Sequence, residues 1–189
     1  KNPILIMPDL GSQSLLDVVE HLNSSERKNI IHVLSSAIEE LHSQNIVHRD
    51  LKLGNIMIKE KNGTKTFSSL IDFGTAMKAG TAQTEHLLGG TRPYMHPSQH
   101  LQDAKAHEGQ DWYAFARILV VLTGACKPEG LESYLMDGIE TKVDHKLRQI
   151  GYRDFEVQII QEFVNVATKP SADDAKSLNL LAQEGLKVS

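Results

Sequence analysis

Residues 48–55 read HRDLKLGN, and a second short motif, DFG, begins at Asp72. The first motif places a carboxylate, an ammonium group and a carboxamide in one short loop, on Asp50, Lys52 and Asn55. The second motif adds another carboxylate on a nearby turn. Phosphoryl transfer from a magnesium nucleotide requires groups of these kinds, because positioning and charge neutralisation supply most of its catalysis. The pair of motifs favours this chemistry over ordinary turn and cap residues.

The sequence between the two motifs predicts a β-hairpin. Residues 56–58 and 67–71 are short β-prone runs, and the dipeptide Asn-Gly at 62–63 between them is a strong turn signal. The ends of the paired strands would bring Asn55 and Asp72 together. Both side chains could then bind the same metal ions through oxygen atoms, which magnesium prefers.

The rest of the chain predicts a mainly helical body. Apolar residues at helical spacing predict a short helix over 15–22, and Asn23 followed by Glu26 predicts the capped start of a longer one. The longer helix is predicted to bury one face, because its apolar residues recur at steps of three and four, at Ile30, Ile31, Val33, Leu34, Ala37, Ile38 and Leu41. An almost wholly apolar run over 111–123, ended by Gly124, predicts a helix buried at the centre of the domain. Three further amphipathic helices are expected near 130–137, 143–150 and 154–168.

With these motifs, the chain resembles the eukaryotic-type serine/threonine protein kinase family. The resemblance implies a mainly α fold, namely the large C-terminal lobe of a kinase, a helical bundle with a small β-hairpin at the catalytic cleft. The lobe would occupy residues 1–189 as one unit. Its parts would be the last small-lobe strand and hinge, the catalytic loop, the activation segment and the central buried helix, at 1–10, 48–55, 72–97 and 111–123.

The N-terminal lobe of the family has no counterpart in this sequence. Its Gly-rich loop, strand lysine and helix glutamate all precede the hinge, and the chain begins at the hinge with Lys1. We therefore expect a fragment of a longer protein, with the missing N-terminal lobe as its partner. As a separate piece it should be nearly inactive, because nothing holds the nucleotide in a reactive geometry.

The resemblance also implies catalytic roles. Asp50 would accept or orient the proton of the substrate hydroxyl, and Lys52 would lie against the transferring phosphoryl group. Thr91, which follows a glycine, would bond both of these side chains, although a simple turn threonine is the competing interpretation. Asn55 and Asp72 would hold the magnesium ions.

ATP is the expected nucleotide. The hinge residues Pro8 and Leu10 would offer backbone groups to adenine. Met57 would form the floor of the adenine pocket, or it is simply a strand residue in the core, and both can hold together. Ile71 and Asp72 are assigned to the same nucleotide site.

The acceptor is expected to be a protein serine or threonine. Lys52, and Gly90-Thr91 upstream of Tyr94, resemble the serine/threonine branch of the family more than the tyrosine branch. Two alternatives stay open. One is a kinase-like binding scaffold, or pseudokinase, and the other is a small-molecule phosphotransferase.

Other matches and departures concern the surroundings of the catalytic loop. Asp111 resembles the family aspartate that holds the backbone of this loop. Where the family has Ala-Pro-Glu, residues 96–98 read His-Pro-Ser, and Lys169 replaces the arginine that pairs with that glutamate. Because both ends of the ion pair are absent together, we interpret this as repacking and not as loss of activity.

Arg49 allows two interpretations. In the family an arginine at this position commonly binds a phosphorylated activation segment, and phosphorylation of Thr81 or Thr84 would add a charge that an arginine can pair. Alternatively, Arg49 bonds local backbone carbonyls.

Composition sets further bounds. With 189 residues, 40% of them hydrophobic, the chain can bury a full core, and its net charge of −4 gives no reason to expect nucleic acid as a partner. No run is long enough for a membrane span, and the lone Cys126 agrees with a reducing, cytoplasmic compartment. His96, His100 and His107 match no zinc spacing, so solvated or capping roles are expected.

Overall fold

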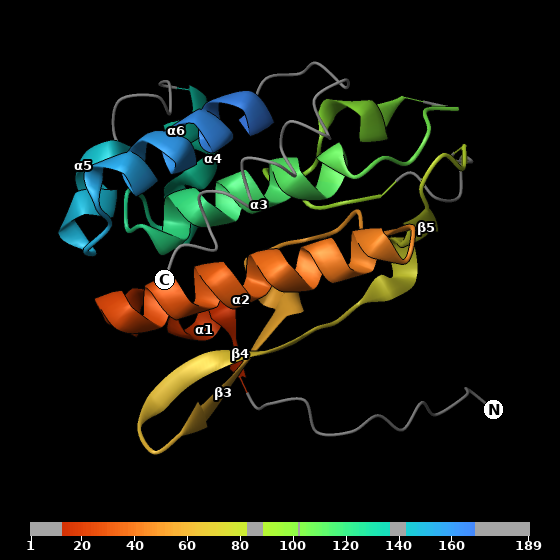
Figure 1. The fold of residues 1–189 in the computed structure, drawn as a ribbon. Coiled ribbons are helices and arrows are strands. Elements are labelled where there is room, and N and C mark those ends of the chain that lie inside the picture. Colours follow the sequence, from red (N-terminus) through yellow and green to blue (C-terminus); the bar gives the residue numbers. More distant parts are fainter. Residues whose placement is uncertain (1–12, 83–88, 102, 137–142, 169–189) are drawn as a thin grey trace.

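A computed structural model describes residues 13–82, 89–101, 103–136 and 143–168 (Figure 1). Three helices form its body: α2 (Ser24–Ser43), α3 (Gly109–Leu122) and α6 (Asp154–Thr168). α3 packs against α2 on one side and against α6 on the other. Shorter helices and turns surround these, namely α1 (Leu15–Val18), α4 (Leu131–Met136), α5 (Val143–Gln149) and the 3-10 turns η1 (Val19–His21), η2 (Leu53–Asn55), η3 (Phe73–Thr75), η5 (Pro97–His100) and η6 (Pro128–Gly130).

Two small antiparallel sheets complete the described part. The larger has the order β1-β3-β4, and the smaller pairs β2 with β5. Their bounds are β1 (Gln13–Ser14), β2 (Ile46–Val47), β3 (Ile56–Lys61), β4 (Thr64–Leu70) and β5 (Met77–Lys78). The mainly helical fold with a small hairpin, expected from the sequence, is confirmed.

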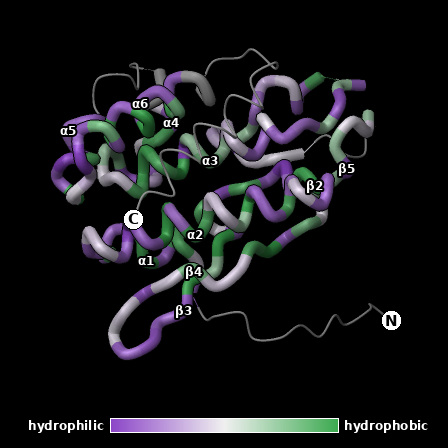
Figure 2. The backbone as a smooth tube through the Cα atoms, in the orientation of Figure 1, coloured by the Kyte–Doolittle hydropathy of each residue, from purple (hydrophilic) through white to green (hydrophobic). Residues whose placement is uncertain are grey.

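The predicted hairpin forms, but its strands are longer than expected. Asn62 and Gly63 make the turn with φ of 54° and 76°, the positive values that this two-residue turn requires. β3 runs on to Lys61, and β4 begins at Thr64 and ends before Ile71, against the prediction of 56–58 and 67–71. The added residues are hydrophilic (Figure 2), so apolar patterning could not reveal them, whereas backbone pairing carries the ladder to the turn.

The start of α2 is the capping box that the sequence predicts. Asn23 Oδ1 accepts a hydrogen bond from the Glu26 amide at 3.0 Å, and Glu26 Oε2 accepts one from the Asn23 amide at 2.9 Å. Upstream, the expected single helix over 15–22 is wrong: α1 ends at Val18, and a 3-10 turn follows.

The buried face of α2 is partly as expected. Its fully buried apolar residues are Ile30, Ile31, Leu34 and Ile38. Three other apolar residues of the predicted face, Val33, Ala37 and Leu41, are only half-buried.

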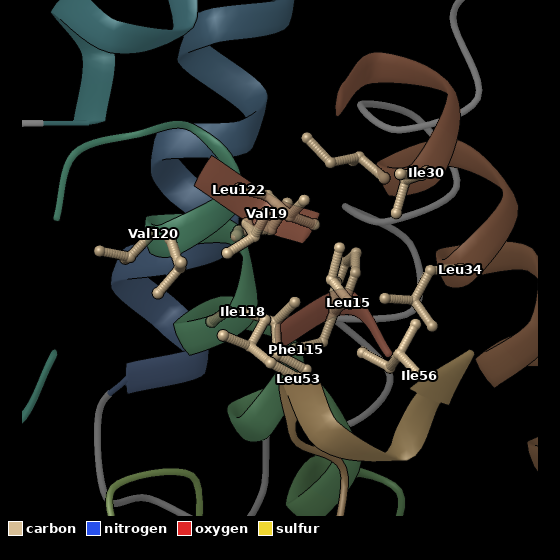
Figure 3. Packing of buried hydrophobic residues seen from close by; sticks show 14 of the residues in the cluster. Leu15, Val19, Ile30, Leu34, Leu53, Ile56, Phe115, Ile118, Val120 and Leu122 are labelled. Carbon is tan, nitrogen blue, oxygen red and sulfur yellow. The ribbon is translucent and has the colours of Figure 1, made fainter. Parts of the chain in front are cut away.

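The core is centred on α3, all of whose residues are buried. Figure 3 shows Phe115 and Ile118 of this helix in one cluster with Leu15 of α1 and Ile56 of β3. Edge-to-face contacts among the rings of α3 and α6 extend the core, with centroid separations of 5.8–5.9 Å, and join Trp112, Phe115 and Phe163.

The bounds of α3 differ slightly from the predicted range of 111–123. The helix begins two residues earlier, at Gly109, and ends one residue earlier, at Leu122.

The remaining helix predictions agree with α4, α5 and α6 to within two residues. Gly124 follows α3 with φ of 75°, the conformation that lets glycine end a helix. None of the helices in the described ranges has the length and apolar character needed to cross a bilayer. The expected hinge at 1–10, and Lys169, lie outside the described residues.

Candidate active site

The loop after β2 is held in place by a carboxylate from the central helix. Asp111 Oδ2 accepts a hydrogen bond from the His48 amide, and Asp111 Oδ1 accepts one from the Arg49 amide, both at 2.8 Å. His42, at the end of α2, places Nε2 2.9 Å from Asp111 Oδ2. Arg49 has φ of 69°, so these bonds hold a turn that a non-glycine residue rarely adopts. The contact expected for Asp111 is confirmed.

Asp50 follows this turn and lies at the centre of a polar cluster. Its Oδ1 accepts a hydrogen bond from Thr91 Oγ1 at 2.8 Å, and its Oδ2 accepts one from Lys52 Nζ at 2.8 Å. Lys52 Nζ also donates to Thr91 Oγ1 at 2.9 Å. Asp50, Lys52 and Thr91 thus form a closed triangle, although Thr91 lies 41 and 39 residues along the chain from the other two.

Asn55 joins the same cluster from the turn η2. Its Nδ2 donates to the backbone oxygen of Asp50 at 2.9 Å and to Asp50 Oδ2 at 3.2 Å. Because both amide hydrogens point at Asp50, the carbonyl oxygen Oδ1 is the atom left to accept another group. The Asn55 side chain thereby holds the Asp50 carboxylate in place and directs its own Oδ1 atom away from Asp50.

Asp72 is connected to this cluster by backbone hydrogen bonds of the preceding residue, Ile71. The amide of Ile71 donates to the Asn55 oxygen at 3.0 Å, and the Ile71 oxygen lies 3.0 Å from His48 Nε2. Asp72 is exposed, and its backbone adopts the left-handed conformation with φ of 63°. A Cβ at Gly74 would lie only 3.3 Å from Asp72 Oδ1, so glycine leaves room for this carboxylate.

The donor chemistry fits magnesium. Asn55 Oδ1 and the carboxylate of Asp72 are hard oxygen ligands of the kind that Mg²⁺ takes. Among the described residues Asp72 belongs to no ion pair. Within those same ranges, no group of three or more His, Cys, Asp or Glu side chains could form a metal site of another type.

The residues assigned to the nucleotide are only partly described. Met57 is half-buried in β3, where it pairs with Ser14 of β1 and Ser69 of β4. Pro8 and Leu10 lie outside the described residues. The adenine-binding roles of Met57, Pro8 and Leu10 stay predictions.

Phe73 stacks on the loop but leaves much of its ring in solvent. Its centroid lies 4.7 Å from that of His48, and 44% of its surface is exposed.

Arg49 is 2% exposed, and its Nη1 donates to the Thr75 oxygen at 3.2 Å. Thr75 Oγ1 in turn donates to the His48 oxygen at 3.1 Å. These contacts match the alternative in which Arg49 bonds local carbonyls. Thr81 is exposed and Thr84 lies outside the described residues, so phosphorylation stays a prediction.

Ser98, where the family usually has a glutamate, lies in a partly buried network that sequence reasoning missed. Ser98 Oγ lies 2.8 Å from His96 Nδ1 and 3.2 Å from His107 Nε2, and it accepts a hydrogen bond from Gln110 Nε2 at 3.0 Å. The prediction of a solvated His96 is wrong, because only 4% of its surface is exposed. Its predicted capping role is confirmed, because the Ser98 amide donates a hydrogen bond to His96 Nδ1.

Burial lowers the pKa of His96 to about 4, and the positive charges of His107 and Arg117 act in the same direction. Burial also lowers the pKa of His107. Burial thus favours the neutral form of both histidines. Cys126 is half-buried against the core, and burial raises its pKa to about 11, as expected for a packed thiol.

Comparison with known proteins agrees with this geometry. The sequence profile of the protein kinase domain matches residues 1–178, which is most of the chain. The chain belongs to the protein kinase family. Serine/threonine-protein kinase SBK1 of Danio rerio is 38% identical over 104 residues, covering 51% of this chain and 26% of that kinase.

Other kinases match at similar levels. Serine/threonine-protein kinase 33 of Mus musculus is 36% identical over 93 residues, which cover 45% of this chain and 19% of the relative. "Probable serine/threonine-protein kinase zyg-1" of Caenorhabditis elegans is 30% identical over 113 residues, which cover 59% of this chain and 16% of the relative. The matched part thus spans at most about a quarter of each of these relatives.

Proposed function

We propose that this chain is the catalytic C-terminal lobe of a serine/threonine protein kinase, which transfers the γ-phosphoryl group of ATP to a protein hydroxyl. The observation that carries the proposal is the closed triangle of Asp50, Lys52 and Thr91, with Asn55 bonded to the same carboxylate. Such preorganised charge suits a reaction in which the protein contributes positioning and electrostatic stabilisation.

Asp50 is the proposed proton acceptor. The acceptor hydroxyl forms a bond to the γ-phosphorus, the bond from that phosphorus to the bridging oxygen breaks, and ADP leaves. The hydroxyl proton passes to a carboxylate oxygen of Asp50. Thr91 and Asn55 fix the direction of this carboxylate, since each bonds one of its oxygens.

Lys52 is the proposed stabiliser of the transferring group. Its side chain is 27% exposed, so its ammonium lies at the edge of a partly dry site where a charge acts strongly. In this structure it bonds Asp50 and Thr91, and so it stands beside the carboxylate that would receive the proton of an acceptor hydroxyl.

Asn55 and Asp72 are the proposed magnesium ligands. Magnesium, when bound, neutralises charge on the phosphates of the nucleotide. Met57, Ile71 and the hinge residues Pro8 and Leu10 are proposed to contact ATP. The N-terminal lobe is proposed as the missing roof of this site.

A transfer assay on the intact gene product tests the proposal. Labelled ATP should transfer phosphate to serine or threonine peptides, and Asp50→Asn should lose that transfer. Asp17→Asn is a matched control, because this exposed carboxylate only caps α1. Label on tyrosine peptides alone would contradict the serine/threonine assignment.

Two other functions are separated by the same assay. A binding scaffold would hold a partner without ATP and transfer nothing, although it would have no need of the bonded Asp50 cluster. A small-molecule phosphotransferase would label a small alcohol in preference to a peptide. Lys52 and the bonded Thr91 favour the peptide acceptor, because these positions resemble the peptide platform of the family.

A further inference from the structure

Gln99 is a buried amide whose hydrogen-bonding groups are all used, and it has no part in the proposed chemistry. It lies in η5 and is 2% exposed. Its Nε2 donates to the Arg49 oxygen at 2.8 Å and to the Gly89 oxygen at 3.0 Å. Its Oε1 accepts a hydrogen bond from the His96 amide at 3.2 Å. One side chain thus joins three backbone segments.

Two of these segments carry the cluster around Asp50. Arg49 directly precedes Asp50, and Gly89 stands two residues before Thr91. The amide of Gln99 therefore bridges the loop that presents the carboxylate and the segment that presents the threonine bonded to it. Fifty and ten residues of chain separate Gln99 from its two acceptors, so neither contact follows from local structure.

Gly90, next to Thr91, packs closely against Met95 and Gln99. Gly90 has φ of 145°, and a Cβ there would lie 2.7 Å from Met95 Sδ and 3.2 Å from Gln99 Nε2. Gly90 therefore packs against the Gln99 amide, and a side chain at this position would require Met95 and Gln99 to shift.

We infer that Gln99 is a positioning residue, which sets the distance between the catalytic loop and the Thr91 segment through its two donated hydrogen bonds. The inference rests on the proposed kinase function, because it concerns how Asp50 is aimed. Gln99 touches no reacting atom. It acts through Thr91 and the backbone before Asp50, where a misplacement of about 1 Å can slow a reaction by roughly 100-fold.

The chemistry of the site requires an amide. Methionine has nearly the same length, yet it donates no hydrogen bond, so both carbonyls would lose their partner. Glutamate has the same shape, but its carboxylate would face two carbonyl oxygens and repel them. Gln99→Met is therefore the cleaner variant, and Gln99→Glu should be at least as harmful.

Gln110 offers a matched control in the same neighbourhood. It is also a buried glutamine, 1% exposed, and its Nε2 donates to Ser98 Oγ at 3.0 Å. This bond reaches neither the catalytic loop nor the Thr91 segment. Gln110→Met thus removes a buried amide of equal size without cutting the bridge.

The test compares the two variants in the intact gene product. Gln99→Met should lower kcat by about tenfold or more with the KM for ATP unchanged, whereas Gln110→Met should stay within about twofold. Hydrogen exchange provides a readout that does not need activity. The backbone amides of residues 48–55 and 89–92 should exchange faster in Gln99→Met than in the unsubstituted protein, and they should not do so in Gln110→Met. The comparison holds when the two variants lose equal amounts of melting temperature.

The outcomes separate this inference from the proposed function. Equal kcat and equal exchange in the two variants would overturn the positioning role while leaving the kinase assignment intact. Absent transfer in the unsubstituted protein would overturn the kinase assignment and the positioning role together, even if exchange showed that Gln99 joins the two segments.

Discussion

Single residues at the centre of the site are tied by short hydrogen bonds. Asp50 accepts bonds from Thr91, Lys52 and Asn55, and Thr91 accepts one from Lys52. These four residues could be identified from the sequence alone, because their motifs resemble those of a known family. Gln99 could not, because a glutamine has no motif of its own and its two acceptors lie elsewhere in the chain.

Thr91 tests the triangle directly. Thr91→Val removes one hydroxyl and little volume, leaving Asp50 Oδ1 without its donor and Lys52 with one acceptor fewer. An unsatisfied polar group of this kind costs about 1–3 kcal/mol, so kcat should fall by roughly 5- to 150-fold if the cost falls on the transition state. Steady-state kinetics on a serine peptide measure it. Thr66→Val, in β4 and away from the site, is the control, and equal rates for both variants would refute the role of the hydroxyl.

At the scale of elements, α3 does two things. Its apolar residues form the middle of the core, and its Asp111 carboxylate reaches out to fix the loop before Asp50. The burial of this helix was predictable, because its sequence is apolar on nearly every side. The exact start of α3 was not predictable. Its first turn includes Gln110, a polar residue that is buried because it bonds Ser98, and no sequence pattern indicates this bond.

Asp111→Ala should destabilise the fold strongly. The substitution leaves the amides of His48 and Arg49 buried without an acceptor, and each unsatisfied buried donor costs about 1–3 kcal/mol. Urea denaturation measures the loss as a lower midpoint. Asp144→Ala is the control, because this carboxylate pairs with Arg148 in solvent and its loss should leave the midpoint unchanged.

The cap of α2 makes a smaller contribution. Asn23→Ala removes the side-chain acceptor of the capping box and should cost about 1 kcal/mol of unfolding free energy. Asn29→Ala, at an exposed position inside the same helix, should cause no loss, because alanine is the better helix former. If the two variants had the same stability, the cap would be unimportant. Chemical denaturation of both variants decides the question.

For the molecule as a whole, the number and order of the main helices were more predictable than their ends. Apolar spacing marks where a helix is buried, so α2, α3 and α6 were predictable. The break after Val18 was not, because the apolar pattern continues unchanged through the 3-10 turn that follows α1. The half-buried positions of α2 were also missed, since helical spacing does not say how wide the covered face is.

Acid should weaken the whole fold through His96. Its pKa is about 4 in the folded protein and about 6.5 when unfolded, so the unfolded chain binds more protons between these values. Stability should therefore be fully present above pH 6.5 and fall as the pH drops toward 4, by at most ~1.4 kcal/mol per pH unit from this group. His107 adds in the same direction.

His96→Asn checks the origin of this slope. Asparagine keeps a side-chain oxygen that can cap η5 but does not titrate, so the loss of stability between pH 6.5 and 4 should be smaller. Thermal melts at a series of pH values measure it. An unchanged slope in the variant would assign the acid sensitivity to other groups.

The most direct measurement is the rate of phosphoryl transfer by Asp50→Asn in the intact gene product. Asparagine keeps the size of the side chain but cannot take the hydroxyl proton. We predict a fall in kcat of about 100- to 10,000-fold, with ATP affinity and melting temperature near those of the unsubstituted protein. A variant that kept most of its rate on a serine or threonine peptide would contradict the assignment of Asp50 as the proton acceptor.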